Sequence, residues 1–184
     1  MPEIETLRLR LRPITLDDLP ALARLWSNPD VMRYLPTCEA RSVEETQVEL
    51  NYMVKHWQEH GFGTWAITFK EASDFIGYCG IQYLHEEPGG VTAEALQNGT
   101  DVEVIAGLAQ PYWKQGVATE ATRAVLRYGF ETVRLPRVVA AIHPENDVSR
   151  HILLKMGMKY DENMHYYGDC PHLVILREEF QRGL

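Results

Sequence analysis

The spacing of hydrophobic residues changes several times along this chain, and the order of those changes restricts the fold more than any other feature. Leu7, Leu9 and Leu11 alternate with arginines, which is the period of a half-buried strand. Helical spacing follows twice, after capping-box sequences that begin at Thr15 and Ser42. Three strand patterns come next, and helix and strand patterns then alternate to the C-terminus. This order predicts a mixed α/β fold.

The same patterns set approximate bounds for the remaining elements. Strands are expected at 65–69, 75–84, 101–108, 137–142 and 172–177. One helix is expected to begin after Gly116, and a short one after Asn146, whose side chain can cap it. Residues 86–100 have the composition of a long loop. Because no repeat or linker interrupts the chain, residues 1–184 are expected to form a single domain.

Composition excludes several classes of protein. The 184 residues include 18 Lys plus Arg and 26 Asp plus Glu, a formal charge of −8, which argues against a protein that mainly binds nucleic acid. No apolar run approaches the roughly 18 residues that cross a membrane. The N-terminus has no apolar signal-peptide core, and three cysteines do not make a disulfide framework. We therefore expect a cytoplasmic protein with reduced thiols.

The segment Asp101–Ala121 has the features of an anion site. A predicted strand leads into a loop with Gly116 and Ala118, and a helix starts at once. Free N–H groups at a helix N-terminus bind phosphate, glycine allows close backbone approach, and Lys114 adds a positive charge. A plain strand–turn–helix connection would also place glycine here. The residues by themselves leave both interpretations open.

The sequence YWKQGVATEA at 112–121 resembles the acyl-CoA loop of the GNAT acetyltransferase superfamily, whose pattern is Q/R-x-x-G-x-G/A. Gly116 and Ala118 match the pattern, whereas Trp113 stands where Gln or Arg is usual. A Trp there resembles the branch of ribosomal-protein N-terminal acetyltransferases. The segments ETLRLRLRPI, SNPDVMRYL, FIGYCGI and ENDVSRHILLKMGMKY are also similar to the family. The last contains N-x-x-S followed by K-x-G-F, with Met158 in place of Phe.

The resemblance implies an α/β (α+β) GNAT fold, with a mostly antiparallel sheet of about seven strands, about four flanking helices and a splayed strand pair for acyl-CoA. It implies an N-acetyltransferase that moves an acetyl group from acetyl-CoA to a primary amine of a protein N-terminus or small molecule, without metal, as a monomer or homodimer. The strand backbone would pair with pantetheine, the loop backbone would hold the pyrophosphate, and Trp113 would contribute through its backbone alone. The cofactor residues so implied are Ala106, Gly107, Leu108, Trp113, Lys114, Gln115, Gly116, Val117, Ala118, Thr119 and Asn146.

Acetyl transfer to an amine needs a base for the ammonium proton and an acid for the departing thiolate. Glu103 is the candidate base, because it lies in an otherwise apolar strand and the resemblance places a Glu there in many members. Carboxylates in apolar surroundings have raised pKa values, which suits a base near neutral pH. A glutamate on the solvent face of a half-exposed strand is the alternative. Ser149 is a candidate acid by resemblance, or else a helix serine that satisfies a backbone group. Further candidate acids are Tyr160, Tyr166 and Tyr167.

Two other functions remain open. His56, Glu59 and His60 match H-x-x-E-H, in which two helix-borne histidines bind zinc, although histidine is also favoured at the end of an ordinary helix. A CoA-binding sensor would keep the fold and lack catalysis, and Glu103 with the intact loop argues against it. The sequence does not identify the acceptor amine.

Overall fold

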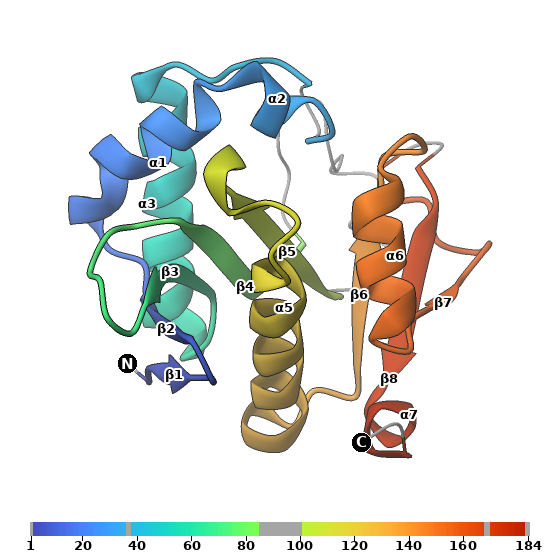
Figure 1. Ribbon diagram of the computed structural model, residues 1–184. Helices are drawn as coiled ribbons and strands as arrows, with labels where there is room; N and C mark the ends of the chain where they lie inside the picture. Colours follow the sequence, from blue (N-terminus) through green and yellow to red (C-terminus); the bar gives the residue numbers. More distant parts are fainter. Residues whose placement is uncertain (1, 36–37, 85–100, 168–169, 183–184) are drawn as a thin grey trace.

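The computed structural model describes residues 2–35, 38–84, 101–167 and 170–182, and in them one sheet carries helices on both faces (Figure 1). Its eight strands lie in the order β1-β2-β3-β4-β5-β6-β8-β7, and within these residues β5 and β6 alone pair in parallel. The expected loop at 86–100 lies outside the described residues. The strands are β1 (Ile4–Glu5), β2 (Leu9–Pro13), β3 (Thr64–Phe69), β4 (Gly77–Tyr83), β5 (Val102–Leu108), β6 (Arg137–Ala141), β7 (Lys159–Tyr160) and β8 (His172–Leu176).

The α-helices match the predicted helical spacing, with two short additions. Along the described chain they are α1 (Leu19–Trp26), α2 (Pro29–Met32), α3 (Val43–His60), α5 (Val117–Tyr128), α6 (Asp147–Lys155) and α7 (Arg177–Arg182). None of the described helices is long and apolar enough to cross a membrane.

The N-terminal patterns form the predicted elements with one displacement. Leu9 and Leu11 are fully buried in β2, whereas Leu7 is 88% exposed because it lies in the turn between β1 and β2. Both capping boxes are present, at Thr15–Asp18 and Ser42–Glu45. In each box the N-cap backbone N–H donates to the carboxylate three residues later, which anchors the first turn.

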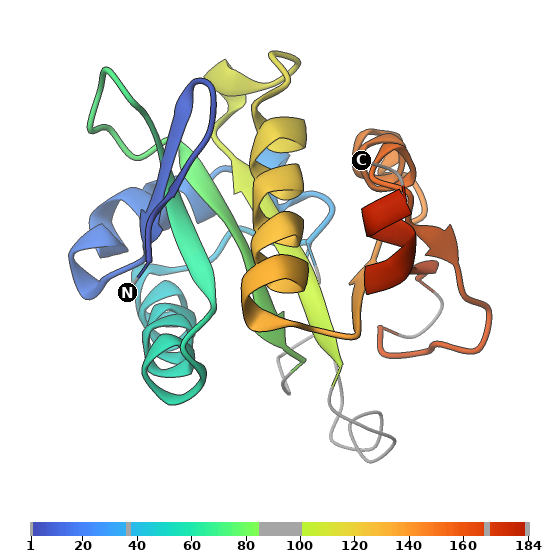
Figure 2. The ribbon, with the colours of Figure 1, turned by 90° about the horizontal axis from the view of Figure 1, so that it is seen from below.

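Two neighbouring residues of β4 show how the helices divide between the faces of the sheet. The ring of Tyr78 meets Trp26 of α1 edge to face, with centroids 5.7 Å apart. The next residue, Cys79, points the other way, and its sulfur lies 3.9 Å from the hydroxyl of Thr122 on α5. Because side chains alternate along a strand, α1 and α5 cover opposite faces. Figure 2 shows α3 with α1, and α6 on the side of α5.

The described residues contain eight strands and six α-helices, more than the implied seven and four. Four of these elements are too short for a hydrophobic period, and the longer ones number six strands and four helices. β1 and β7 have two residues each, α2 has four and α7 has six. A period of 2 or 3.6 residues needs a longer window to be detected. The implied mixed, mostly antiparallel GNAT-type sheet is otherwise confirmed.

The splayed strand pair is confirmed at β5 and β6. β5 pairs with β4 along all of its seven residues. It meets β6 at a single register pair, Glu103 with Val139. Figure 1 shows the two strands diverging from there toward the end of the sheet where α5 begins. The diverging half of β5 is therefore an edge that β6 does not cover.

Candidate active site

The hydrogen-bond direction along β5 decides which backbone groups face the open edge. The N–H of Ala109 donates to the carbonyl of Ile76, on the β4 side, at 2.9 Å. In a regular antiparallel ladder this direction alternates with every residue. Gly107 therefore also faces β4, while Ala106 and Leu108 turn their N–H and C=O groups toward the diverging β6. Two of the three predicted strand residues can thus present backbone groups to a ligand.

Gly107 is needed because a side chain does not fit at this position. A Cβ on Gly107 would lie 2.6 Å from the ring of Tyr78, and the carbonyl of Gly107 faces Gly77 on β4. The tyrosine ring covers the face of Gly107, so that a larger residue would displace it. The glycine lets β4 and β5 approach closely beneath this ring.

Trp113 has a role that its sequence position did not reveal. Its indole Nε1–H donates to the carbonyl of Leu108 at 2.7 Å. This bond ties the loop to the last residue of β5 and occupies one of the two lone pairs of the Leu108 carbonyl. The N–H of Leu108 and both backbone groups of Ala106 also face this edge. The expectation that Trp113 acts through its backbone alone was incomplete, since a Trp indole can donate a hydrogen bond as Gln or Arg would.

The loop after β5 ends in an exposed helix N-terminus. Lys114 and Gly116 both have left-handed backbone conformations, with φ of 60° and 77°. The first intrahelical bond of α5 runs from the N–H of Glu120 to the carbonyl of Gly116 at 3.0 Å. The N–H groups of Val117, Ala118 and Thr119 therefore lack intrahelical acceptors. Donors at the positive end of a helix dipole are the arrangement that binds anions, so this turn is a candidate anion site.

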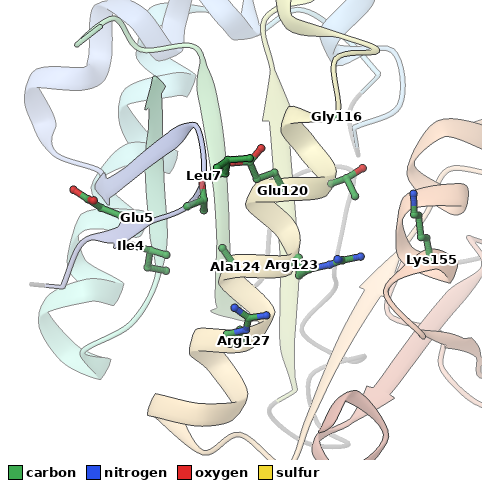
Figure 3. Close-up of a pocket in the computed structure, with 11 residues that line it drawn as sticks. Ile4, Glu5, Leu7, Gly116, Glu120, Arg123, Ala124, Arg127 and Lys155 are labelled. Carbon is green, nitrogen blue, oxygen red and sulfur yellow. The ribbon is translucent and has the colours of Figure 1, made fainter. Parts of the chain in front are cut away.

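An open depression of about 630 Å³ extends from this turn along α5. Its lining includes Gly116, Thr119 and Arg123 from the loop and α5, and Lys155 from α6. Figure 3 shows Arg123 extending from α5 toward α6. The lining of the depression also includes Arg127, Glu5 and Glu120, so the depression carries charges of both signs. Arg123 and Lys155 are the cations that could face a ligand with several phosphates.

Glu103 is a buried carboxylate. Its residue is 5% exposed, and its Oε2 accepts a hydrogen bond from the hydroxyl of Tyr167 at 3.0 Å. Its register partners on the adjacent strands are Gln82 and Val139, both buried. The alternative interpretation, in which Glu103 lies on the solvent face of the strand, is therefore wrong. The carboxylate lies at the last point where β5 and β6 still touch.

Asn146 and Ser149 lie at the start of α6. The side-chain oxygen of Asn146 accepts from the N–H of Ser149 at 3.1 Å, so that Asn146 is the N-cap that its sequence position predicts. Ser149 is half-buried in the first turn. Because β5 and β6 are parallel and each leads into a helix, the N-termini of α5 and α6 lie at the same end of the sheet.

The three late tyrosines lie in different surroundings. Tyr160 is 51% exposed on β7. The hydroxyl of Tyr166 donates to Asp101 at 2.5 Å, and burial together with this carboxylate raises the pKa of Tyr166 to about 12. The hydroxyl of Tyr167 donates to Glu103 at 3.0 Å.

A histidine that the sequence patterns did not indicate holds these tyrosines. The Nε2 atom of buried His172 accepts the backbone N–H groups of Tyr166 and Tyr167, at 3.1 and 3.3 Å. Burial lowers the pKa of His172, which favours the neutral ring that can accept. Although the partners are only five or six residues away, the bond depends on how the chain before β8 folds back on His172, which no periodic pattern or motif in the sequence indicates.

The geometry of His56 argues against the zinc hypothesis. Its Nδ1 lies 2.8 Å from the carbonyl of Phe62, and its Nε2 accepts the N–H of Tyr83 at 3.0 Å. Nε2 must be unprotonated to accept, so Nδ1 carries the proton and donates. Both ring nitrogens are thus used by backbone groups and neither has a lone pair free for a metal. His56 fastens α3 to β4.

Comparisons with known proteins give consistent results. The profile of the acetyltransferase (GNAT) domain family matches residues 8–159. The uncharacterized N-acetyltransferase p20 of Bacillus licheniformis is 26% identical over 95% of this chain and 92% of its own length. The crystal structure of an acetyltransferase from Agrobacterium tumefaciens has a TM-score of 0.79 at 23% identity, covering 95% of this chain and 94% of that chain. RimJ of Mycobacterium smegmatis, solved with CoA-disulfide, has a TM-score of 0.73 at 21% identity, covering 97% and 88%.

Proposed function

The chain belongs to the GNAT acetyltransferase family, whose members use acetyl-CoA, and on that premise we propose that it transfers the acetyl group to a primary amine by direct attack. The acceptor is the α-amine of a protein N-terminus or the amine of a small molecule. One observation carries this proposal. The open edge of β5 runs from a buried carboxylate, Glu103, at the point where the strands diverge, toward the end of the sheet at which the N-terminus of α5 is exposed.

The cofactor would lie along β5 and across the start of α5. The free backbone groups of Ala106 and the N–H of Leu108 would pair with the pantetheine arm as an added strand does. The backbone of residues 113–119 would surround the pyrophosphate, with Arg123 and Lys155 beside it for a further phosphate. The orientation of the β5 backbone and the position of the two cations support this placement.

The reaction balances with one base and one acid. The amine nitrogen attacks the thioester carbonyl carbon, the C–N bond forms, and the C–S bond breaks. The amine gives up a proton, and the sulfur takes one up. Glu103 would accept the proton, since it is the buried carboxylate at the divergence. Tyr167 and Ser149 are the candidate acids, and the contact of Tyr167 with Glu103 favours the tyrosine.

We infer that residues 1–184 form one catalytic domain that acts in the cytoplasm, as a monomer or homodimer. One continuous sheet and a family match over residues 8–159 support a single domain. No disulfide joins Cys38, Cys79 and Cys170 in the described chain, which accords with a reducing compartment.

Substitution of Glu103 tests the chemistry. Glu103→Gln keeps the shape and the hydrogen bond of Tyr167, so the affinity for CoA should stay at the wild-type value. The turnover at pH 7 should fall by about 10²–10⁴-fold, as for loss of a general base. The loss should shrink at higher pH, because more of the acceptor amine is then already neutral. The measurement is a rate–pH profile by free-thiol release, with one good amine from a panel.

Two variants serve as comparisons. Tyr167→Phe should lower turnover without changing CoA affinity, whereas Tyr160→Phe should match the wild type because its ring is exposed on β7. A Glu103→Gln enzyme with near wild-type turnover at pH 7 would refute the base assignment. A wild-type protein that binds CoA and releases no thiol with any amine in the panel would indicate a sensor instead.

A further inference from the structure

The turn of the β1–β2 hairpin holds the first turn of α5 through one carboxylate. Glu120 Oε1 accepts the hydroxyl of Thr6 at 2.6 Å and the backbone N–H of Arg8 at 2.9 Å. Its Oε2 accepts Nε and Nη2 of Arg8, both at 2.8 Å. Figure 3 shows Glu120 beside Leu7, which lies between these two partners. Burial by itself would raise the pKa of Glu120, but these hydrogen bonds hold it below its usual range.

The third nitrogen of the same guanidinium reaches the loop before the helix. Nη1 of Arg8 donates to the carbonyl of Gln115 at 3.1 Å. A Cβ on Gly116 would lie 3.6 Å from Nη2, so the guanidinium lies directly beside the loop. Arg8 thus joins the hairpin, the loop and the helix. The fork geometry of arginine suits this, because its separate nitrogens reach the carboxylate and the carbonyl in fixed directions, whereas Lys has its donors on a single nitrogen.

The bond to Gln115 sets the direction of a neighbouring donor. In a planar trans peptide the carbonyl of Gln115 and the N–H of Gly116 point in opposite directions. Holding the carbonyl against Arg8 therefore turns the Gly116 N–H away from the hairpin. Glycine permits this peptide to rotate more freely than other residues would, so the loop needs an outside contact to keep one orientation.

Charge gives a second reason for the contact. A carboxylate in the first turn of a helix stabilises the helix dipole, yet it repels an anion that binds the same turn. Glu120 occupies this place in α5. Its ion pair with Arg8 at 2.8 Å offsets the repulsion.

We propose that Arg8 is a positioning residue of the acetyl-CoA site, which orients the Gln115–Gly116 peptide for the pyrophosphate and neutralises Glu120. The inference rests on the cofactor placement in the proposed function. It assigns to the N-terminal hairpin a role in cofactor affinity, although the hairpin supplies none of the implied cofactor residues. It also explains the exposure of Leu7, because the turn is shaped to present Thr6 and Arg8 to Glu120.

The test compares two neighbouring arginines of the hairpin. Arg8→Gln should raise the Kd for CoA, measured by calorimetry, and the KM for acetyl-CoA by about tenfold, as for loss of a charge-assisted hydrogen bond. The kcat should stay within about twofold, because the reacting groups lie elsewhere. Arg10→Gln should leave both values unchanged, since Arg10 is paired only with Glu3 and Glu5 among the described residues, at 3.9 and 3.7 Å. Arg8→Lys should be intermediate.

Two further measurements separate positioning from general loss of structure. The kcat/KM for S-acetylpantetheine, which lacks the pyrophosphate, should not change in Arg8→Gln, and an equal loss with both donors would overturn the proposal. In Glu120→Gln the two roles of Arg8 act in opposite directions: loss of the carboxylate removes a repulsion, and the freed Arg8 no longer holds the Gln115 carbonyl. We expect the loss of orientation to dominate and CoA binding to weaken. Tighter binding in Glu120→Gln, or an unchanged Kd in Arg8→Gln, would overturn the positioning role. If the wild type itself failed to bind CoA, the proposed function would fail first.

Discussion

Replacing Trp113 with Phe removes one hydrogen bond and keeps an aromatic ring at the loop. The bond joins Nε1 of Trp113 to the carbonyl of Leu108 at 2.7 Å, and Leu108 is 8% exposed. A neutral hydrogen bond contributes about 0.5–1.5 kcal/mol to the free energy of unfolding, and a buried acceptor left without a partner costs more. Trp113 is 37% exposed, so water can replace part of the bond, and we expect a loss of about 1 kcal/mol. In a chain of this length such a loss lowers the Tm by about 2–4 °C.

The same bond holds the loop in the conformation that would bind the pyrophosphate. If CoA binding must restore that conformation, the loss of about 1 kcal/mol appears as an increase of about fivefold in the Kd for CoA. Calorimetric titration of wild type and Trp113→Phe measures it. Trp65→Phe is the matched control, because its indole donates to the carbonyl of Pro2 at 3.0 Å, away from the loop. The control should lose stability and keep its CoA affinity. A wild-type Kd in Trp113→Phe would refute the reasoning.

Two further predictions concern the supports of the site. Gly77→Ala should cost about 1–3 kcal/mol in urea unfolding and weaken CoA binding, because its Cβ would lie 2.3 Å from the carbonyl oxygen of Gly107 and push β5 from β4; an unchanged midpoint would contradict this. Burial lowers the pKa of His172 below its usual value of about 6.5, so as pH falls below that value the unfolded chain takes up the proton first and the free energy of unfolding falls. The Tm of the wild type should therefore drop more between about pH 7.5 and 5.5 than the Tm of His172→Gln, and equal slopes of Tm against pH would refute this. Turnover should fall over the same pH range, because protonated His172 can no longer accept the backbone N–H groups of Tyr166 and Tyr167.

Local sequence determined the elements that are long enough to repeat a pattern. The capping box at Ser42 begins α3, and Gly61, with a left-handed φ of 73°, ends it. Alternation identified β2 through Leu9 and Leu11, and the strand–loop–helix pattern identified the turn at Gly116. These features depend on residues within about one or two turns of each other, so the printed order of residues contains the needed information.

The tertiary structure alone decided which of these residues work together. Glu120 meets Arg8 across 112 positions of sequence, and Tyr167 meets Glu103 across 64. Sequence marked Glu103 as a candidate and left its exposure open, and the register of β5 with β4 and β6 placed it among buried neighbours. The histidine pair of the zinc hypothesis also rested on a short sequence motif. The structure argues against it, because both ring nitrogens of His56 bond to backbone groups outside α3. Periodicity describes geometry along one element, whereas contacts between elements depend on sheet register and helix placement, which are set by packing of the whole core.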